Sequence, residues 1–147
     1  MISLAATAGL SCISGCREPG SRVERTEQAA KAQELDDAKA EFAHHRALRI
    51  GTFRGEHLVA RTQPMLVSAL ASATPLTAAA QADITDKIRV FQLRLDEAGN
   101  AIEALRAVPV GAWAEREADV ARLLLRLEAA RDAAWEALRE GTRITSS

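Results

Sequence analysis

Residues 84–105, ITDKIRVFQLRLDEAGNAIEAL, give the clearest indication of the fold. Their apolar side chains recur at alternating spacings of four and three residues, which is the period of a helix face that packs against another helix. The pattern predicts a helix from about residue 75 to residue 106. Thr74 is expected to cap it with its hydroxyl, and Pro75 suits the first helical position. We call the apolar face the seam; it consists of Ile84, Ile88, Phe91, Leu95, Ala98, Ile102 and Leu105.

A second helix is expected over residues 112–140, with Gly141 as its stop, because glycine readily adopts the left-handed conformation past a helix end. Residues 107–111, AVPVG, join the two helices. So short a link between helices of similar length predicts an antiparallel hairpin. Trp113 and Trp135 lie near its two ends and are expected to cap layers of the core. The apolar stripe of the second helix consists of Val120, Leu123, Leu127, Ala130, Ala134 and Leu138.

The N-terminal half predicts further helix, with Ser21 and Glu24 forming a capping box at its start. One interpretation is a break near Gly51, which gives a helix over residues 21–50 and a shorter one that ends near residue 73, with a kink favoured at Pro64. The other is a continuous helix in which Gly51 and Gly55 permit close approach of a neighbour. The apolar stripe begins with Leu35, Ala38 and Phe42, continues at Ile50 and Phe53, and shifts to another face at Val59, Leu66 and Ala69.

These patterns predict an all-α protein, an antiparallel bundle of three to four helices with a C-terminal hairpin. The bundle domain is expected over residues 21–141, followed by a disordered tail at residues 142–147. Of the 147 residues, 48% are hydrophobic and 27% are charged, with a net charge of -1. So neutral a balance argues against a nucleic-acid partner. The sequence contains no run of roughly 20 uninterrupted apolar residues of the kind that crosses a bilayer.

The only two cysteines, Cys12 and Cys16, lie near the N-terminus. Ile13, Ser14, Gly15 and Cys16 close an apolar run, and this stretch resembles the lipobox of bacterial lipoproteins. The resemblance implies that residues 1–15 are a signal peptide that is removed, that Cys16 carries a lipid, and that residues 16–20 form a short tether to the membrane.

The resemblance also implies an address in the bacterial cell envelope. In well-studied lipoproteins an Asp directly after the lipidated cysteine retains the protein in the inner membrane. Arg17 stands at that position in this sequence. The implied location is therefore the outer membrane, facing the periplasm.

Signatures of catalysis or metal binding are weak. Glu41 precedes His44 by three residues, as in di-iron bundles, but such a site needs a second Glu-x-x-His pair, and none occurs. Adjacent His44 and His45 point to different helical faces, and His57 stands apart from them. No glycine-rich phosphate loop or activated-serine motif is present. We therefore expect no enzyme activity, cofactor, metal site or small-molecule substrate.

Two functions remain open. The first is a membrane-anchored structural or protein-interaction module, because helices with long seams recognise other helices or a second copy of themselves. The second is a periplasmic chaperone, or a binding protein that senses stress or metal. Residues 76–81, LTAAAQ, resemble the Leu-Thr-any-any-Gln motif of Spy-like chaperones, with Gln81 one position later than in the motif.

Overall fold

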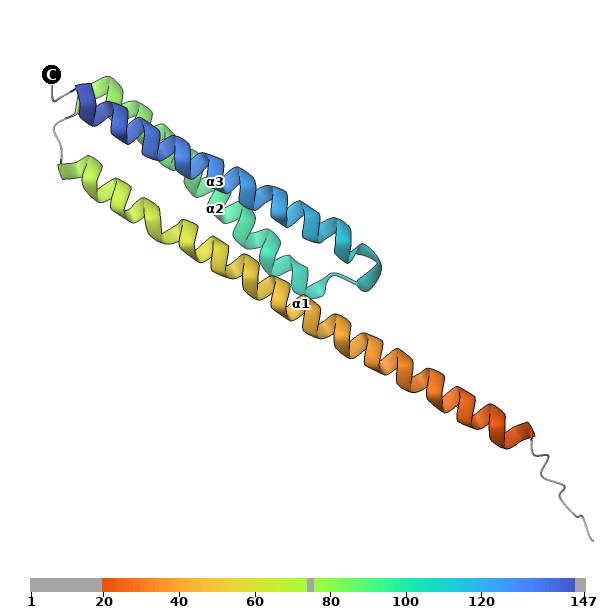
Figure 1. Cartoon of the computed structure of the whole chain (residues 1–147). Coiled ribbons are helices and arrows are strands. Elements are labelled where there is room, and N and C mark those ends of the chain that lie inside the picture. Colours follow the sequence, from red (N-terminus) through yellow and green to blue (C-terminus); the bar gives the residue numbers. More distant parts are fainter. Residues whose placement is uncertain (1–19, 74–75, 145–147) are drawn as a thin grey trace, which may run out of the picture. The chain divides into compact units, whose positions relative to one another are not determined.

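A computed structural model describes residues 20–73 and 76–144, and this part of the chain is helical almost throughout (Figure 1). The chain divides into two compact units, Met1–Ala40 and Glu41–Ser147. The elements are α1 (Gly20–Ala73), α2 (Ala78–Ala104), the short 3-10 turns η1 (Leu105–Ala107) and η2 (Val110–Ala112), and α3 (Trp113–Ile144). The prediction of an all-α helical bundle is confirmed.

In the first unit, the structure describes residues 20–40 of α1. Every side chain described there, from residue 22 onward, is exposed. Leu35 and Ala38 were expected to begin the buried stripe, but Leu35 is 57% exposed and Ala38 is exposed as well. This part of the prediction is wrong, because the unit contains no second helix in its described residues against which the stripe could pack.

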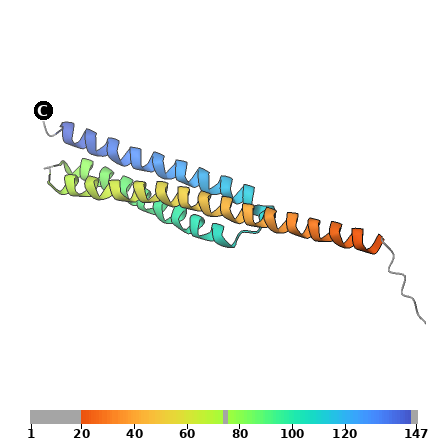
Figure 2. The same ribbon diagram turned by 60° about the horizontal axis from the view of Figure 1, so that its bottom comes forward.

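In the second unit, α1 from Glu41 onward lies along the α2–α3 hairpin (Figures 1 and 2). Arg54 of α1 contacts Glu103 of α2, and three residues later His57 contacts Leu95. As the residue number rises along α1, the number of the contacted residue in α2 falls. Helices α1 and α2 are therefore antiparallel.

The direction of α1 relative to α3 follows from two further contacts. The ring of Phe42 meets Trp113 edge to face at 5.8 Å, and Arg49 pairs with Glu117. The residue numbers in α1 and in α3 rise together along these contacts, so α1 and α3 are parallel. The bundle therefore runs up, down and up.

Among the described residues the core consists of two clusters: the larger joins all three helices, and the smaller, with Ile84 and Leu138, joins α2 and α3. The seam of α2 faces this core: Ile84, Phe91, Ala98, Ile102 and Leu105 are buried, and Ile88 and Leu95 pack against the buried residues. The stripe of α3 faces the same core, and Trp113 is 5% exposed. The predicted hairpin therefore packs along the faces that its sequence period indicates. The buried residues of α1 and α3 are Ile50, Phe53, Ala60, Trp113, Val120, Leu124, Leu127, Ala134, Ala137 and Leu138.

The predicted break near Gly51 is wrong, since α1 is one helix from Gly20 to Ala73 and continues through residue 64. The penalty of a glycine inside a helix is only about 1 kcal/mol, and the buried face on both sides of Gly51 favours continuity. The rival interpretation is right that the helix is continuous, but the glycines do not admit a close neighbour. A Cβ built at Gly51 or Gly55 would meet no atom within 4 Å.

The predicted shift of the α1 stripe at Val59 is wrong as well. Val59 is 56% exposed, and its neighbour Ala60 is 6% exposed. The buried face keeps its heptad period through Ile50, Phe53, His57 and Ala60, with a half-buried histidine at a position where an apolar residue was expected. The side chains of residues 66 and 69, the other predicted members, lie outside the described part.

Two helix ends differ from prediction. Helix α2 begins at Ala78 with Thr77 as its cap, whose hydroxyl accepts the Ala80 N–H at 3.2 Å; residues 74 and 75 lie outside the described residues. Helix α3 passes through Gly141 to Ile144, so residues 142–144 are helical and do not belong to a disordered tail.

Candidate functional site

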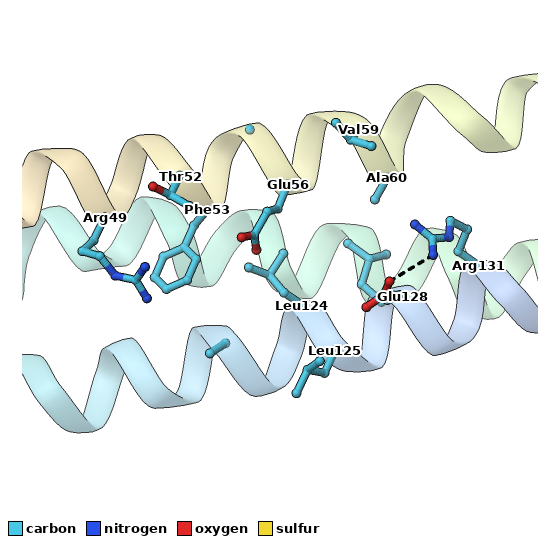
Figure 3. A pocket seen from close by; sticks show the side chains of 13 residues that line it. Arg49, Thr52, Phe53, Glu56, Val59, Ala60, Leu124, Leu125, Glu128 and Arg131 are labelled. Atoms are coloured by element: carbon cyan, nitrogen blue, oxygen red, sulfur yellow. Dashed lines mark hydrogen bonds and ion pairs between the residues drawn. The ribbon is translucent and has the colours of Figure 1, made fainter.

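An open groove of about 790 Å³ lies between α1 and α3 (Figure 3). It follows α1 from Arg49 to Ala60, roughly 17 Å or three helical turns. Its lining residues are Arg49, Thr52, Phe53, Gly55, Glu56, Val59, Ala60, Ala121, Leu124, Leu125, Leu127, Glu128 and Arg131.

The groove exists because small residues line the place where α1 and α3 approach. Gly55 has no neighbouring atom within 4 Å of an added Cβ, and Ala60 and Ala121 contribute only a methyl group each. The packing of Ile50, Phe53 and Ala60 of α1 in the same core cluster as Phe91 of α2 holds α1 in place. The two groove walls are therefore fixed although side chains do not fill the space between them.

The surface of the groove is largely apolar. Its floor consists of side chains that belong to the core, among them Phe53 and Leu124, which are 3% and 9% exposed. Leu125 and Val59 rise from the walls and are 65% and 56% exposed. Two large apolar side chains beside an apolar floor are typical of a surface that binds another apolar surface.

One end of the groove is closed by Arg49. Its guanidinium lies over the ring of Phe53 at 4.7 Å from the ring centre, and its Nε donates to a carboxylate oxygen of Glu117. The ion pair is half-buried. Arg49 is thus held by both walls, and its charge is already neutralised.

The other end carries Arg131, which pairs with Glu128 at 3.2 Å and with Asp132 at 2.9 Å. Partial burial alone would lower the pKa of Arg131, but its hydrogen bonds and attraction to Asp132 and Glu128 outweigh that effect and raise the pKa above its usual value. Glu56, between the two ends, forms no ion pair with another described residue. The groove therefore offers one carboxylate that is free to meet a cationic side chain.

No residue of the seam lines this groove, whereas Phe53, Gly55, Val59 and Leu127 do, although the sequence predicted for them only a role in helix packing and not a binding site. The seam lies in the core, and the lipobox residues Ile13, Ser14, Gly15 and Cys16 lie outside the described residues. Sequence reasoning missed the groove because a hollow depends on how two helices approach. The available signal was Val59 and Leu125, which are large apolar residues beside buried positions, together with Gly55 between them.

The histidines do not assemble into a site. Glu41, His44 and His45 are exposed, and the half-buried His57 donates from Nε2 to the Leu95 carbonyl at 2.9 Å. In residues 20–73 and 76–144, no three His, Cys, Asp or Glu side chains come together so that they could hold a metal ion.

Comparisons of the chain with protein-family models, with curated proteins and with solved structures gave no match. None of the helices described here has a stretch that is both long and apolar enough to cross a membrane.

Proposed function

We propose that this protein is a non-enzymatic interaction module that binds an amphipathic helix of a partner protein in the α1–α3 groove. The observation that carries the proposal is the apolar groove itself, with Leu125 and Val59 exposed on its walls. Burying a large aliphatic side chain is worth about 1.5–3 kcal/mol, so a partner that covers both residues gains substantially from the hydrophobic effect.

The shape and charge of the groove favour a helix as its ligand. Three helical turns offer apolar side chains at positions i, i+3, i+4 and i+7, which is the arrangement that a groove of this length accepts. Because Glu56 is free while Arg49 and Arg131 are paired, the bound helix is expected to place a Lys or Arg opposite Glu56.

Membrane anchoring is the second part of the proposal. It is supported by the lipobox-like sequence at residues 13–16, in which Cys16 would carry the lipid. With Arg17 after the cysteine, the protein would sit on the outer membrane and face the periplasm. The anchor would keep the groove close to partners in the bacterial envelope and thereby raise their effective concentration.

Photo-crosslinking in cells tests the proposal. A photoreactive residue at Leu125, inside the groove, is compared with one at Leu93, which is 54% exposed but does not line the groove. We expect a discrete protein adduct from position 125 and none from position 93. A Cys16→Ala variant should leave the membrane fraction and form less adduct. Equal adducts from both positions would contradict the groove, and an unchanged membrane fraction would contradict the anchor.

A substitution pair gives an independent test with the captured partner. Leu125→Arg places a charge in the groove and is expected to weaken binding at least about tenfold, since it removes roughly 1.5 kcal/mol or more of apolar contact. Leu93→Arg makes the same exposed change elsewhere and should leave binding unchanged.

The chaperone alternative makes a different prediction. Thr77, in the stretch that resembles the chaperone motif, caps the start of α2, so this residue has a structural role regardless of function. A chaperone would suppress aggregation of many unfolding clients and would give many adducts at Leu125 in place of a discrete one.

A further inference from the structure

A second hollow of about 530 Å³ lies on another side of the hairpin, between the C-terminal end of α2 with η1 and the first half of α3. It shares no lining residue with the α1–α3 groove. We call it the hairpin pocket. Its lining residues are Ala101, Ala104, Leu105, Val108, Arg116, Asp119, Val120, Arg122, Leu123 and Arg126.

The base of the hairpin pocket is apolar. Leu105 and Val120 are 1% and 2% exposed and form part of the core. Ala101 and Ala104 lie on the α2 side, where their short side chains leave space that longer ones would occupy. A volume of this size lies within the range of about 300–1,000 Å³ that is usual for small-molecule sites.

The charge of the pocket comes entirely from α3 and is strongly one-sided. Arg116 lies 3.6 Å from a carboxylate oxygen of Asp119, and Arg122 pairs with the same carboxylate. Arg126 has no ion-pair partner among the described residues. Three arginines against one aspartate leave an excess of two positive charges beside an apolar base.

We propose that the hairpin pocket binds a single-chain anionic amphiphile, with its carboxylate on the arginines and its acyl chain along the alanines and Leu123. Guanidinium groups bind carboxylates through paired, charge-assisted hydrogen bonds. The chain gains about fourfold in affinity for each methylene that it removes from water. Arg126 supplies the principal contact, because Asp119 already occupies Arg116 and Arg122.

Calorimetric titration of the full chain tests this proposal. Cys16→Ala is included so that no attached lipid fills the pocket. Dodecanoate, kept below its micelle concentration, is compared with dodecyltrimethylammonium, which has the same chain and the opposite charge. We expect dodecanoate to bind at least about tenfold more tightly, as one charge-assisted hydrogen bond implies.

Three substitutions locate the binding site. Arg126→Gln should weaken dodecanoate binding about tenfold, whereas Arg139→Gln, at an exposed arginine of α3 outside the pocket, should leave it unchanged. Asp119→Asn removes the competing carboxylate and should strengthen binding several-fold, a gain that damage to the fold would not produce. Circular dichroism of each variant checks that the helices are retained.

Several results would overturn the proposal. Equal affinities for the anionic and cationic chains would mean nonspecific detergent binding. An unchanged affinity in Arg126→Gln would place the ligand elsewhere. Binding to phosphatidylglycerol vesicles but not to monomeric dodecanoate would assign the arginines to a membrane surface. Because the α1–α3 groove shares no residue with this pocket, none of these outcomes changes the crosslinking expected at Leu125. The two proposals are therefore tested separately.

Discussion

Two glycines with opposite surroundings show what a single residue contributes to this bundle. At Gly51 an added Cβ would lie in open space, whereas at Gly141 it would lie 3.2 Å from Ile84 Cδ1. Gly51→Ala is therefore expected to raise the free energy of unfolding by about 0.5–1 kcal/mol through helix propensity alone. Gly141→Val should lower it by about 1–3 kcal/mol, since the new side chain displaces buried neighbours. Urea unfolding measures both, and a stabilised Gly141→Val would contradict the packing at that position.

A third glycine supports the contact between α1 and α2. A Cβ at Gly99 would lie 3.1 Å from Nε2 of His57, the atom that donates to the Leu95 carbonyl at 2.9 Å. Gly99→Ala should displace the imidazole and cost about 1 kcal/mol through the lost hydrogen bond, which cancels the usual gain of alanine in a helix. Thermal unfolding of the Gly99→Ala and Gly55→Ala variants is compared to test this effect, because an added Cβ at Gly55 would meet no neighbour. Equal stabilisation of the two variants would show that the histidine contact contributes nothing.

These residues also mark the limit of what the sequence predicts. A glycine after an apolar stripe is typical of a helix stop, and Gly141 was interpreted in that way. The sequence does not show that Ile84, more than fifty positions away, lies against it. A glycine that ends a helix and a glycine that makes room for a neighbour look the same until the helices are paired.

At the scale of the element, the regularity of each helix decided how well it could be predicted. Helices α2 and α3 carry apolar residues at nearly every inward position, so their buried faces follow from the period alone. In α1 the inward position between Phe53 and Ala60 holds His57, while the apolar Val59 points outward. The apolar pattern in the sequence therefore shifts to another face at Val59, although the helix is continuous and its buried face does not shift.

The continuity of α1 can be measured directly. Spin labels at His44→Cys and Leu58→Cys, after replacement of Cys12 and Cys16 by alanine, are expected to lie about 21 Å apart along an unbroken helix, at the usual rise of about 1.5 Å per residue. Pulsed electron resonance gives this distance. A break near Gly51 would bring the labels closer together and widen the distribution.

A matched pair in α3 controls for the labels themselves. Arg122→Cys and Glu136→Cys have the same separation in sequence, and both positions are exposed within one helix. The two pairs should give the same mean distance. A shorter distance in α1 alone would show that the glycines bend it.

The pairing of α1 with α2 has an electrostatic component that depends on pH. Arg54 donates to Glu103 at 3.0 Å, and this hydrogen bond is the main cause that lowers the pKa of Glu103 below its usual 4.5. Desolvation opposes it, and attraction to Arg106 and Arg54 adds to it. Because the folded state favours the carboxylate, its contribution to stability is present above pH 4.5 and is lost as the pH falls through the lowered pKa. The pair is exposed, so the contribution is small.

NMR titration of the Glu103 carboxyl tests this contact. In Arg54→Gln its pKa should rise toward the usual value, because the largest cause of the shift has been removed. Arg106→Gln removes only a weaker attraction and should raise the pKa less. A larger effect of Arg106→Gln would mean that Arg54 does not hold the carboxylate in solution.

For the molecule as a whole, the bundle could be predicted from the seam, but the α1–α3 groove and the hairpin pocket could not. A seam specifies which faces meet, and it does not specify where small residues leave space between helices. The α1–α3 groove depends on Gly55, Ala60 and Ala121, and the hairpin pocket on Ala101 and Ala104. Alanine is so common in this sequence that these positions carry no distinguishing signal before the helices are packed.

The α2–α3 hairpin is not expected to be stable without α1. Phe91 and Leu127, each 1% exposed, belong to the same core cluster as Phe53 of α1, so removing α1 would expose them to water. A fragment of residues 41–144 should unfold cooperatively in urea, whereas a fragment of residues 76–144 should show no cooperative transition as a monomer. Phe53→Ala in the longer fragment should cost about 3–5 kcal/mol, as for other buried phenylalanines. A monomeric hairpin that unfolds as sharply as the longer fragment would mean that α1 does not stabilise the core.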